Sequence, residues 1–210
     1  MLMKKNIIGL SMLLAASSAF AGTASESYLE LGLGYANFRR DGNSLADAAV
    51  WRGVFNYALA EGAPVLIADV RTNLEYAKEY SHNEDYFIAN AEAVLGASVL
   101  SIIKAYAFAG PEIQNFHGFD ALTDSYADKD WKLGLTYGAA VEVEAIPGFL
   151  HVTPYARFSY IDKMERNRYG VDVSFWFSHF GIGSDLNYQD FRGNADAEAW
   201  QACIYAGLRF

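Results

Sequence analysis

The last eleven residues, Trp200 to Phe210, read WQACIYAGLRF and decide the fold. In an extended strand, alternate side chains point to opposite faces. One face of this stretch carries Trp200, Ala202, Ile204, Ala206, Leu208 and Phe210, and the other carries Gln201, Cys203, Tyr205, Gly207 and Arg209. The first face is apolar throughout, and an aromatic residue stands at each end of it. The stretch therefore predicts a β-strand with one face in an apolar medium.

Nine other segments repeat this alternation, and we predict a strand in each. They cover residues 27–38, 49–59, 64–76, 87–97, 101–113, 130–144, 150–161, 169–177 and 181–188. Each confines its polar residues mostly to one face, which favours strand over helix. With residues 200–210 they make ten strands.

The connections alternate in length, with short links at 60–63, near 98, at 145–149 and at 178–180. Longer polar links fall at 39–48, 77–85, 115–129, 162–167 and 190–197. Short turns on one side and long loops on the other are typical of a transmembrane, antiparallel, up-and-down β-barrel. The predicted fold is thus all-β with ten strands. Eight strands are the alternative, but they leave too much chain without structure.

Residues 1–21 are predicted to be a cleaved signal peptide. Lys4 and Lys5 precede a short apolar run, and Ala19 and Ala21 form a small-residue cleavage pattern. The run is too short to span a bilayer as a helix, although a retained membrane anchor is the alternative. Cleavage leaves residues 22–210 as one barrel domain and moves the formal charge from −9 to −11, since two lysines are lost. This acidity argues against a nucleic-acid partner.

Outward aromatic residues are expected near both ends of the strands, as in the girdles of membrane barrels. The predicted girdle comprises Trp51, Tyr76, Trp131, Tyr160, Tyr169, Tyr188, Trp200, Phe175 and Phe177. The alternative is that these residues form the core of a soluble sandwich, but a sandwich does not need aromatic residues at two levels.

Charged residues on the inward faces predict an ion-pair network in the lumen. The predicted members are Glu30, Asp69, Arg71, Glu92, Lys104, Glu142, Arg157, Asp172, Asp185 and Arg209. Folding each hairpin about its connection pairs Arg71 with Glu92, Lys104 with Glu142, and Arg157 with Asp172, which in turn meets Asp185. Glu30 and Arg209 are expected at one level across the closing strands. Buried charges are retained when they are paired, so we predict a lumen filled by side chains. The alternative is a narrow solute pathway lined by these charges.

The polar loops carry residues that could support catalysis or ligand binding, but their sequence patterns are not specific for either. His82 and His117 lie beside carboxylates, as a hydrolase at the barrel rim would require. The resemblance to omptin proteases, however, is limited to strand number. Four aspartates at 120, 124, 128 and 130 could gather a divalent cation, but they lack the pattern of a calcium loop, and no metal or cofactor is predicted. A basic fourth loop with Lys163, Arg166 and Arg168 suits lipopolysaccharide phosphates, although a solvated loop explains it equally well.

The signal peptide, the ten alternating strands, the girdles and the terminal Phe210 resemble the small bacterial outer-membrane β-barrels, a porin-like superfamily. The size and the YAGLRF ending look somewhat like the YfaZ-type outer-membrane proteins. The resemblance implies a location in the outer membrane, contact with its lipid and lipopolysaccharide, a monomer, and Phe210 as a signal to the barrel-assembly machinery. Leu208 departs from the pattern, since Tyr is frequent there. The function expected is a non-enzymatic envelope or surface-interaction role. A narrow channel and a rim hydrolase on lipid or peptide are the alternatives.

Overall fold

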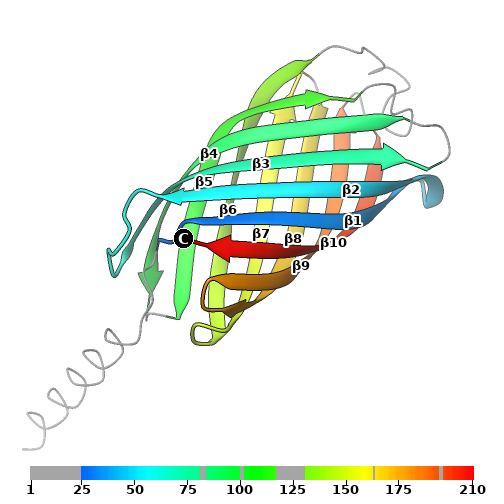
Figure 1. The fold of residues 1–210 in the computed structure, drawn as a ribbon. Coiled ribbons are helices and arrows are strands. Elements are labelled where there is room, and N and C mark those ends of the chain that lie inside the picture. Colours follow the sequence, from blue (N-terminus) through cyan, green and yellow to red (C-terminus); the bar gives the residue numbers. More distant parts are fainter. Residues whose placement is uncertain (1–24, 81–83, 100–101, 117–130, 163, 194–195) are drawn as a thin grey trace, which may run out of the picture.

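A computed structural model gives the structure of residues 25–80, 84–99, 102–116, 131–162, 164–193 and 196–210. Within these ranges the chain forms ten strands and no helix, and they close into a single barrel (Figure 1). No helix in the described part is long and apolar enough to cross a membrane. The predicted fold class and strand number are confirmed. The predicted signal peptide lies outside the described residues.

The strands follow one another around the ring, each antiparallel to its neighbours. They are β1 (Tyr28–Arg40), β2 (Asn43–Ala58), β3 (Leu66–Glu79), β4 (Asp85–Val99), β5 (Ile103–Asn115), β6 (Lys132–Ile146), β7 (Leu150–Ile161), β8 (Met164–Phe177), β9 (Phe180–Gly193) and β10 (Ala197–Arg209). β1 and β10 close the ring through a continuous register from Tyr28 opposite Arg209 to Arg39 opposite Glu198. No strand edge is left open along this seam, which removes a site of aggregation.

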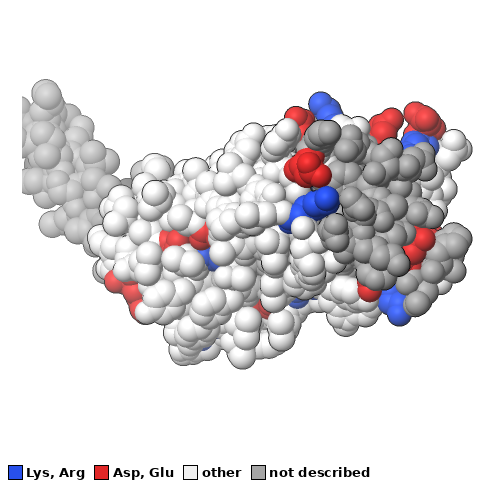
Figure 2. All heavy atoms as spheres, turned by 90° about the horizontal axis from the view of Figure 1, so that it is seen from above, with Lys and Arg blue, Asp and Glu red and all other residues white. Residues whose placement is uncertain are grey.

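The closing strand β10 alternates between buried and exposed residues from end to end. Inward Gln201 and Cys203 are almost completely buried, whereas outward Trp200 and Ile204 are 58% and 71% exposed. The other strands show the same outward apolar face. Figure 2 shows the result on one side of the molecule, where most of the wall lacks charged atoms and many charged residues gather near one end. An apolar outer wall of this kind needs an apolar medium around it.

The two ends of the barrel differ, and we name them by their connections. The turn end holds Ser25 and Phe210, and the Phe210 N–H donates to the Ser27 carbonyl at 3.2 Å. The loop end holds the connections after β1, β3, β5, β7 and β9. Both described chain ends therefore lie at the turn end, as an even number of strands requires.

The strands extend further toward the loop end than the sequence predicted. Residues 39–48 and 162–167 were expected to be loops, yet β1, β2 and β8 occupy most of them. Asp41 and Gly42, both with positive φ, make the two-residue turn between β1 and β2. Such a turn matches the twist of a hairpin and lets pairing continue up to it. The strands of 12–16 residues exceed the 9–11 needed to cross a bilayer, so polar hairpin ends project beyond the apolar wall.

Candidate functional site in the barrel lumen

Three arginine–glutamate ion pairs bridge the lumen between non-adjacent strands. Arg157 of β7 meets Glu92 of β4 at 3.1 Å, and Arg166 of β8 meets Glu112 of β5 at 3.1 Å. Arg168 of β8 meets Glu75 of β3 at 2.5 Å. The side chains of Glu92 and Glu112 are completely buried. These pairs tie one half of the ring to the other through its interior.

Neutral side chains complete the hydrogen bonding of the bridged carboxylates. Tyr86 donates to Glu75 at 2.8 Å, and Gln201 donates to the same carboxylate at 3.4 Å. A buried carboxylate is retained only when its remaining lone pairs also find donors.

Glu112 is satisfied in the same way. It accepts hydrogen bonds from Gln114 at 2.5 Å, Ser159 at 3.1 Å and Asn90 at 3.2 Å. The bridges are therefore part of a connected polar network inside the barrel.

The turn half of the lumen holds a second group of charges. Lys104 lies 3.0 Å from Glu142 and 3.4 Å from Glu144, and the His151 ring is 2.9 Å from Glu142. The predicted meeting of Lys104 with Glu142 occurs through the register of β5 and β6.

Asp172 and Asp185 are opposite one another in the register of β8 and β9, as the folded hairpin predicted. Both carboxylates are contacted by ion-pairing or hydrogen-bonding groups from other strands. Arg52 forms an ion pair with Asp185, Tyr155 donates to Asp185 at 2.9 Å, and Tyr205 donates to Asp172 at 2.6 Å.

Two of the predicted pairings are wrong because the arginines have other partners. Arg157 was expected to meet Asp172, but its register partner on β8 is Arg168, and it turns to Glu92. Arg71 is opposite Glu92 in the register, yet it donates to Asn56 at 3.2 Å and lies over the Tyr106 ring at 5.3 Å. Glu92 is already occupied by Arg157, which leaves Arg71 to these weaker partners.

The closing strands also differ from the expected pairing. Arg209 forms its ion pair with Glu26 at 3.1 Å and lies over the Trp176 ring at 4.0 Å. Glu30 is opposite Gly207 in the register, two positions from Arg209. Asp69, the remaining predicted member, accepts hydrogen bonds from Ser25 and from Asn56, the latter at 3.0 Å.

The predicted basic loop is wrong for the two of its residues that the structure describes. Arg166 and Arg168 lie in β8, are 2% and 7% exposed, and face the lumen. Both arginines stand an even number of residues before Asp172, which was predicted to face the lumen, and before Ser174 on the same face. This even spacing was the sequence signal that could have placed the arginines inside the barrel. Lys163, His82, His117 and the aspartates at 120, 124, 128 and 130 lie outside the described residues.

The alternation along the strands also puts Arg52, Glu75, Glu112 and Glu144 on inward faces, but the sequence indicates no partners for them. Each is a member of an ion pair in the structure. Their partners, apart from Glu144's, lie on strands that are not adjacent, so no hairpin pairing could have revealed them.

Large aromatic side chains fill much of the remaining interior by lying over glycines. A Cβ atom at Gly170 would stand 2.6 Å from the Tyr155 ring, and one at Gly183 would stand 2.4 Å from the Tyr205 ring. Gly138 leaves the same kind of space for Phe108. The glycines and aromatics of the inner faces are thus complementary in shape, and a cavity of about 130 Å³ remains between the charged groups.

Glu142, Glu144 and His151 could together offer ligand atoms to a metal ion, since these atoms lie within 4.8 Å of one another. The Lys104 ammonium already lies close to both carboxylates. A cation would have to displace it, so the chemistry of this group is that of an ion pair.

The predicted girdle residues lie on the outer wall and form aromatic pairs there. The tilted rings of Trp51 and Tyr76 have centroids 5.4 Å apart, and Tyr188 lies 5.1 Å from Trp200. The others with outward exposure are Trp131, Tyr160, Tyr169, Phe175 and Phe177. Phe210 is 63% exposed and stacks on Phe55 at 6.2 Å.

Some known proteins resemble this barrel in their fold. No family model and no curated protein matches the chain. Among solved structures, an outer-membrane channel from Pseudomonas putida F1 aligns over 91% of this chain and 98% of its own, at 7% identity with a TM-score of 0.50. The fold is that of the bacterial outer-membrane β-barrels.

Two other outer-membrane barrels are similar in outline. The attachment invasion locus protein Ail of Yersinia pestis aligns over 88% of this chain and 98% of its own, at 12% identity and a TM-score of 0.46. Neisserial surface protein A aligns over 88% and 97%, at 12% identity and 0.43. At such identities the likeness concerns the fold, and the narrower likeness to YfaZ-type proteins stays a prediction.

Proposed function

We propose that this protein is an integral outer-membrane barrel whose lumen is filled, and that its role in the envelope is structural or interactive rather than enzymatic. The observation that carries the proposal is the set of three buried arginine–glutamate bridges across the lumen. Wide aqueous channels come with many more strands, whereas barrels of this size fill their interior with side chains. Here the filling is hydrogen-bonded from wall to wall.

Lipid is the first partner of such a barrel. The exposed apolar wall and its aromatic pairs support contact with acyl chains and interfacial groups. Contact with lipopolysaccharide follows from this location, but the lumen-facing Arg166 and Arg168 do not contribute to it. Phe210, exposed at the turn end, supports recognition by the barrel-assembly machinery. We further propose that the barrel acts as a monomer.

Conductance in planar bilayers tests the filled lumen. The purified barrel should give little or no steady current, while a wide porin in the same bilayer shows that channels would be detected. Large, steady conductance steps from the purified barrel would contradict the proposal and favour the solute channel. The cavity of about 130 Å³ in the lumen is the observation that favours a narrow solute channel as the second candidate function.

The non-enzymatic role is tested separately. Screens for hydrolysis of lipid and peptide substrates should show no turnover by the purified barrel. Turnover that is lost in His82→Ala or His117→Ala variants would establish a rim hydrolase instead. For the envelope role, cells without the chain should become more sensitive to detergents, and expression of the chain should restore resistance.

A further inference from the structure

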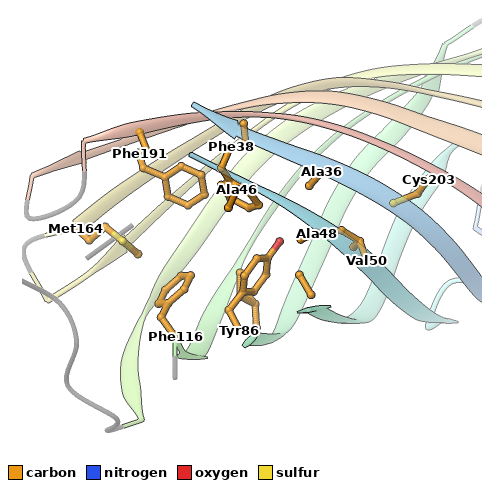
Figure 3. Packing of buried hydrophobic residues seen from close by; sticks show 14 residues of the cluster. Ala36, Phe38, Ala46, Ala48, Val50, Tyr86, Phe116, Met164, Phe191 and Cys203 are labelled. Atoms are coloured by element: carbon orange, nitrogen blue, oxygen red, sulfur yellow. The ribbon is translucent and has the colours of Figure 1, made fainter. Parts of the chain in front are cut away.

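The interior changes in character along the barrel axis. At the loop end, five large inward side chains form a layer that we call the apolar cap: Phe38, Tyr86, Phe116, Met164 and Phe191. Figure 3 shows these side chains gathering inside the barrel from β1, β4, β8 and β9 and from the residue after β5. None of them is more than 3% exposed. Buried Glu79, Gln114 and Arg166 also lie at the loop ends of their strands.

Ring contacts connect the aromatic members of the cap across the lumen. Phe191 lies 6.2 Å from Phe38, Phe38 lies 6.1 Å from Tyr86, and Tyr86 lies 5.5 Å from Phe116. The spacing is that of packed aromatic pairs. Ala36, two residues further from the loop end than Phe38, is completely buried.

The turn half of the lumen is different. Its cavity of about 130 Å³ is lined mostly by charged and polar groups, such as Glu30, Arg71 and Thr153, and it reaches up to the bridge residues Arg166 and Arg168. A polar cavity of this size has room for several water molecules. The side chains of Glu26, Glu142 and Arg209, which also line it, are 24%, 20% and 19% exposed.

We propose that the lumen is a one-sided compartment, which water and small ions enter from the turn end and which the apolar cap closes at the loop end. The proposal rests on the proposed function, since it assumes a barrel in a membrane with a filled lumen. It adds the position of the barrier. Apolar constrictions exclude ions because water does not fill them, so the cap seals the loop end, while the arginine–glutamate bridges beneath it limit access from the turn end.

Cysteine labelling tests this arrangement in the folded barrel. In a Cys203→Ser background, Thr153→Cys places a thiol in the polar cavity and Ala36→Cys places one beneath the cap. A charged methanethiosulfonate reagent should modify Thr153→Cys and leave Ala36→Cys unmodified. Adding Phe38→Ser and Phe191→Ser should raise the labelling rate of Ala36→Cys by about tenfold or more, because polar side chains allow the constriction to fill with water.

Two controls separate access from misfolding. Phe38→Leu with Phe191→Leu keeps the cap apolar and should leave Ala36→Cys protected. Tyr35→Ala with Tyr188→Ala removes outward aromatics from the same two strands and should also have no effect on labelling. Folding of every variant is checked by the mobility of the unheated and heated protein in detergent gels.

Labelling of Ala36→Cys as fast as Thr153→Cys in the otherwise unchanged barrel would overturn the proposal, and so would protection of both. These results are independent of the conductance test. Steady channels would contradict the filled lumen, whereas a cap that does not protect Ala36→Cys in a non-conducting barrel would contradict only the one-sided compartment.

Discussion

Arg168 and Glu75 join directly opposite walls of the barrel, with their charged atoms 2.5 Å apart. Four strands separate β8 from β3 in either direction around the ring. The pair therefore cannot form until the ring has closed, or nearly closed, around it. Breaking a buried pair leaves one charge without compensation, which costs far more than losing an exposed pair.

Removing one member of this pair should destabilise the barrel strongly. Arg168→Met is expected to lower the free energy of unfolding by about 3–5 kcal/mol, since Glu75 then stays buried without its cation. In the double variant Arg168→Met with Glu75→Gln, most of this loss should disappear. Urea unfolding of the refolded barrel in lipid vesicles measures both changes.

The exposed pair of Arg192 and Asp190 provides the matched control. Its charged atoms are 2.6 Å apart, but the Arg192 side chain is 65% exposed. Arg192→Gln should leave the free energy of unfolding unchanged within error. Equal losses of unfolding free energy from Arg168→Met and Arg192→Gln would show that the buried pair stabilises the barrel no more than the exposed pair does.

The lumen should not tolerate a methyl group at Gly170. A Cβ atom there meets the Tyr155 ring at 2.6 Å, and Gly170→Ala should cost about 1–3 kcal/mol through overpacking. Gly53→Ala is the control, because its nearest neighbour is a flexible Leu31 methyl at 3.6 Å. In a Tyr155→Ala background the cost at Gly170 should shrink, and a cost that persists unchanged would place its origin in the backbone.

A charge on the outer wall should be costly at mid-height and cheap near the loop end. Ile204 is 71% exposed on β10, and Ile204→Arg should lower the free energy of unfolding in lipid by about 2–4 kcal/mol. Glu198 is also outward on β10 but lies at its loop end, so Glu198→Arg should cost about 1 kcal/mol or less. Similar costs at both positions would argue against a bilayer around this wall.

Deleting Phe210 should impair assembly in cells more than folding in the test tube. The residue is exposed and lies beyond the last strand, so its loss removes one stacking contact with Phe55 and one backbone hydrogen bond to Ser27. Refolding into detergent should therefore proceed nearly as before. The fraction of folded barrel in the outer membrane should fall, and Phe210→Trp should retain it. Unchanged insertion of the deletion variant would remove Phe210 from the assembly signal.

Alternation along each strand was sufficient to predict the ring of ten. Every predicted strand overlaps an observed one, and residues 150–161 agree at both ends. The inner face could also be predicted, because parity assigns each side chain to one side of the wall. Strand limits at the loop end could not, since polar hairpin ends such as 39–48 carry no apolar face to mark them.

The ion-pair partners inside the lumen could not be predicted from the sequence, for a different reason. Hairpin folding pairs only adjacent strands, and it found Lys104 with Glu142. Arg157 and Arg168 instead reach across the lumen, where the choice of partner depends on side-chain length and on which carboxylates are already occupied. The apolar cap was missed because most of its members come from segments that were predicted to be loops, as with Phe116, Met164 and Phe191.

The meeting of β1 and β10 at the turn end has a consequence for chain order. Since the Phe210 N–H already donates to the Ser27 carbonyl, a short linker could join the two ends, and new termini could be opened at the Asp41 and Gly42 turn. Such a circular permutant would keep the pairing of every strand with its neighbours and would lose only the turn between β1 and β2. It would also move the terminal aromatic into the interior of the sequence. Comparing its refolding with its export would therefore separate the information that forms the ring from the information that directs it to the membrane.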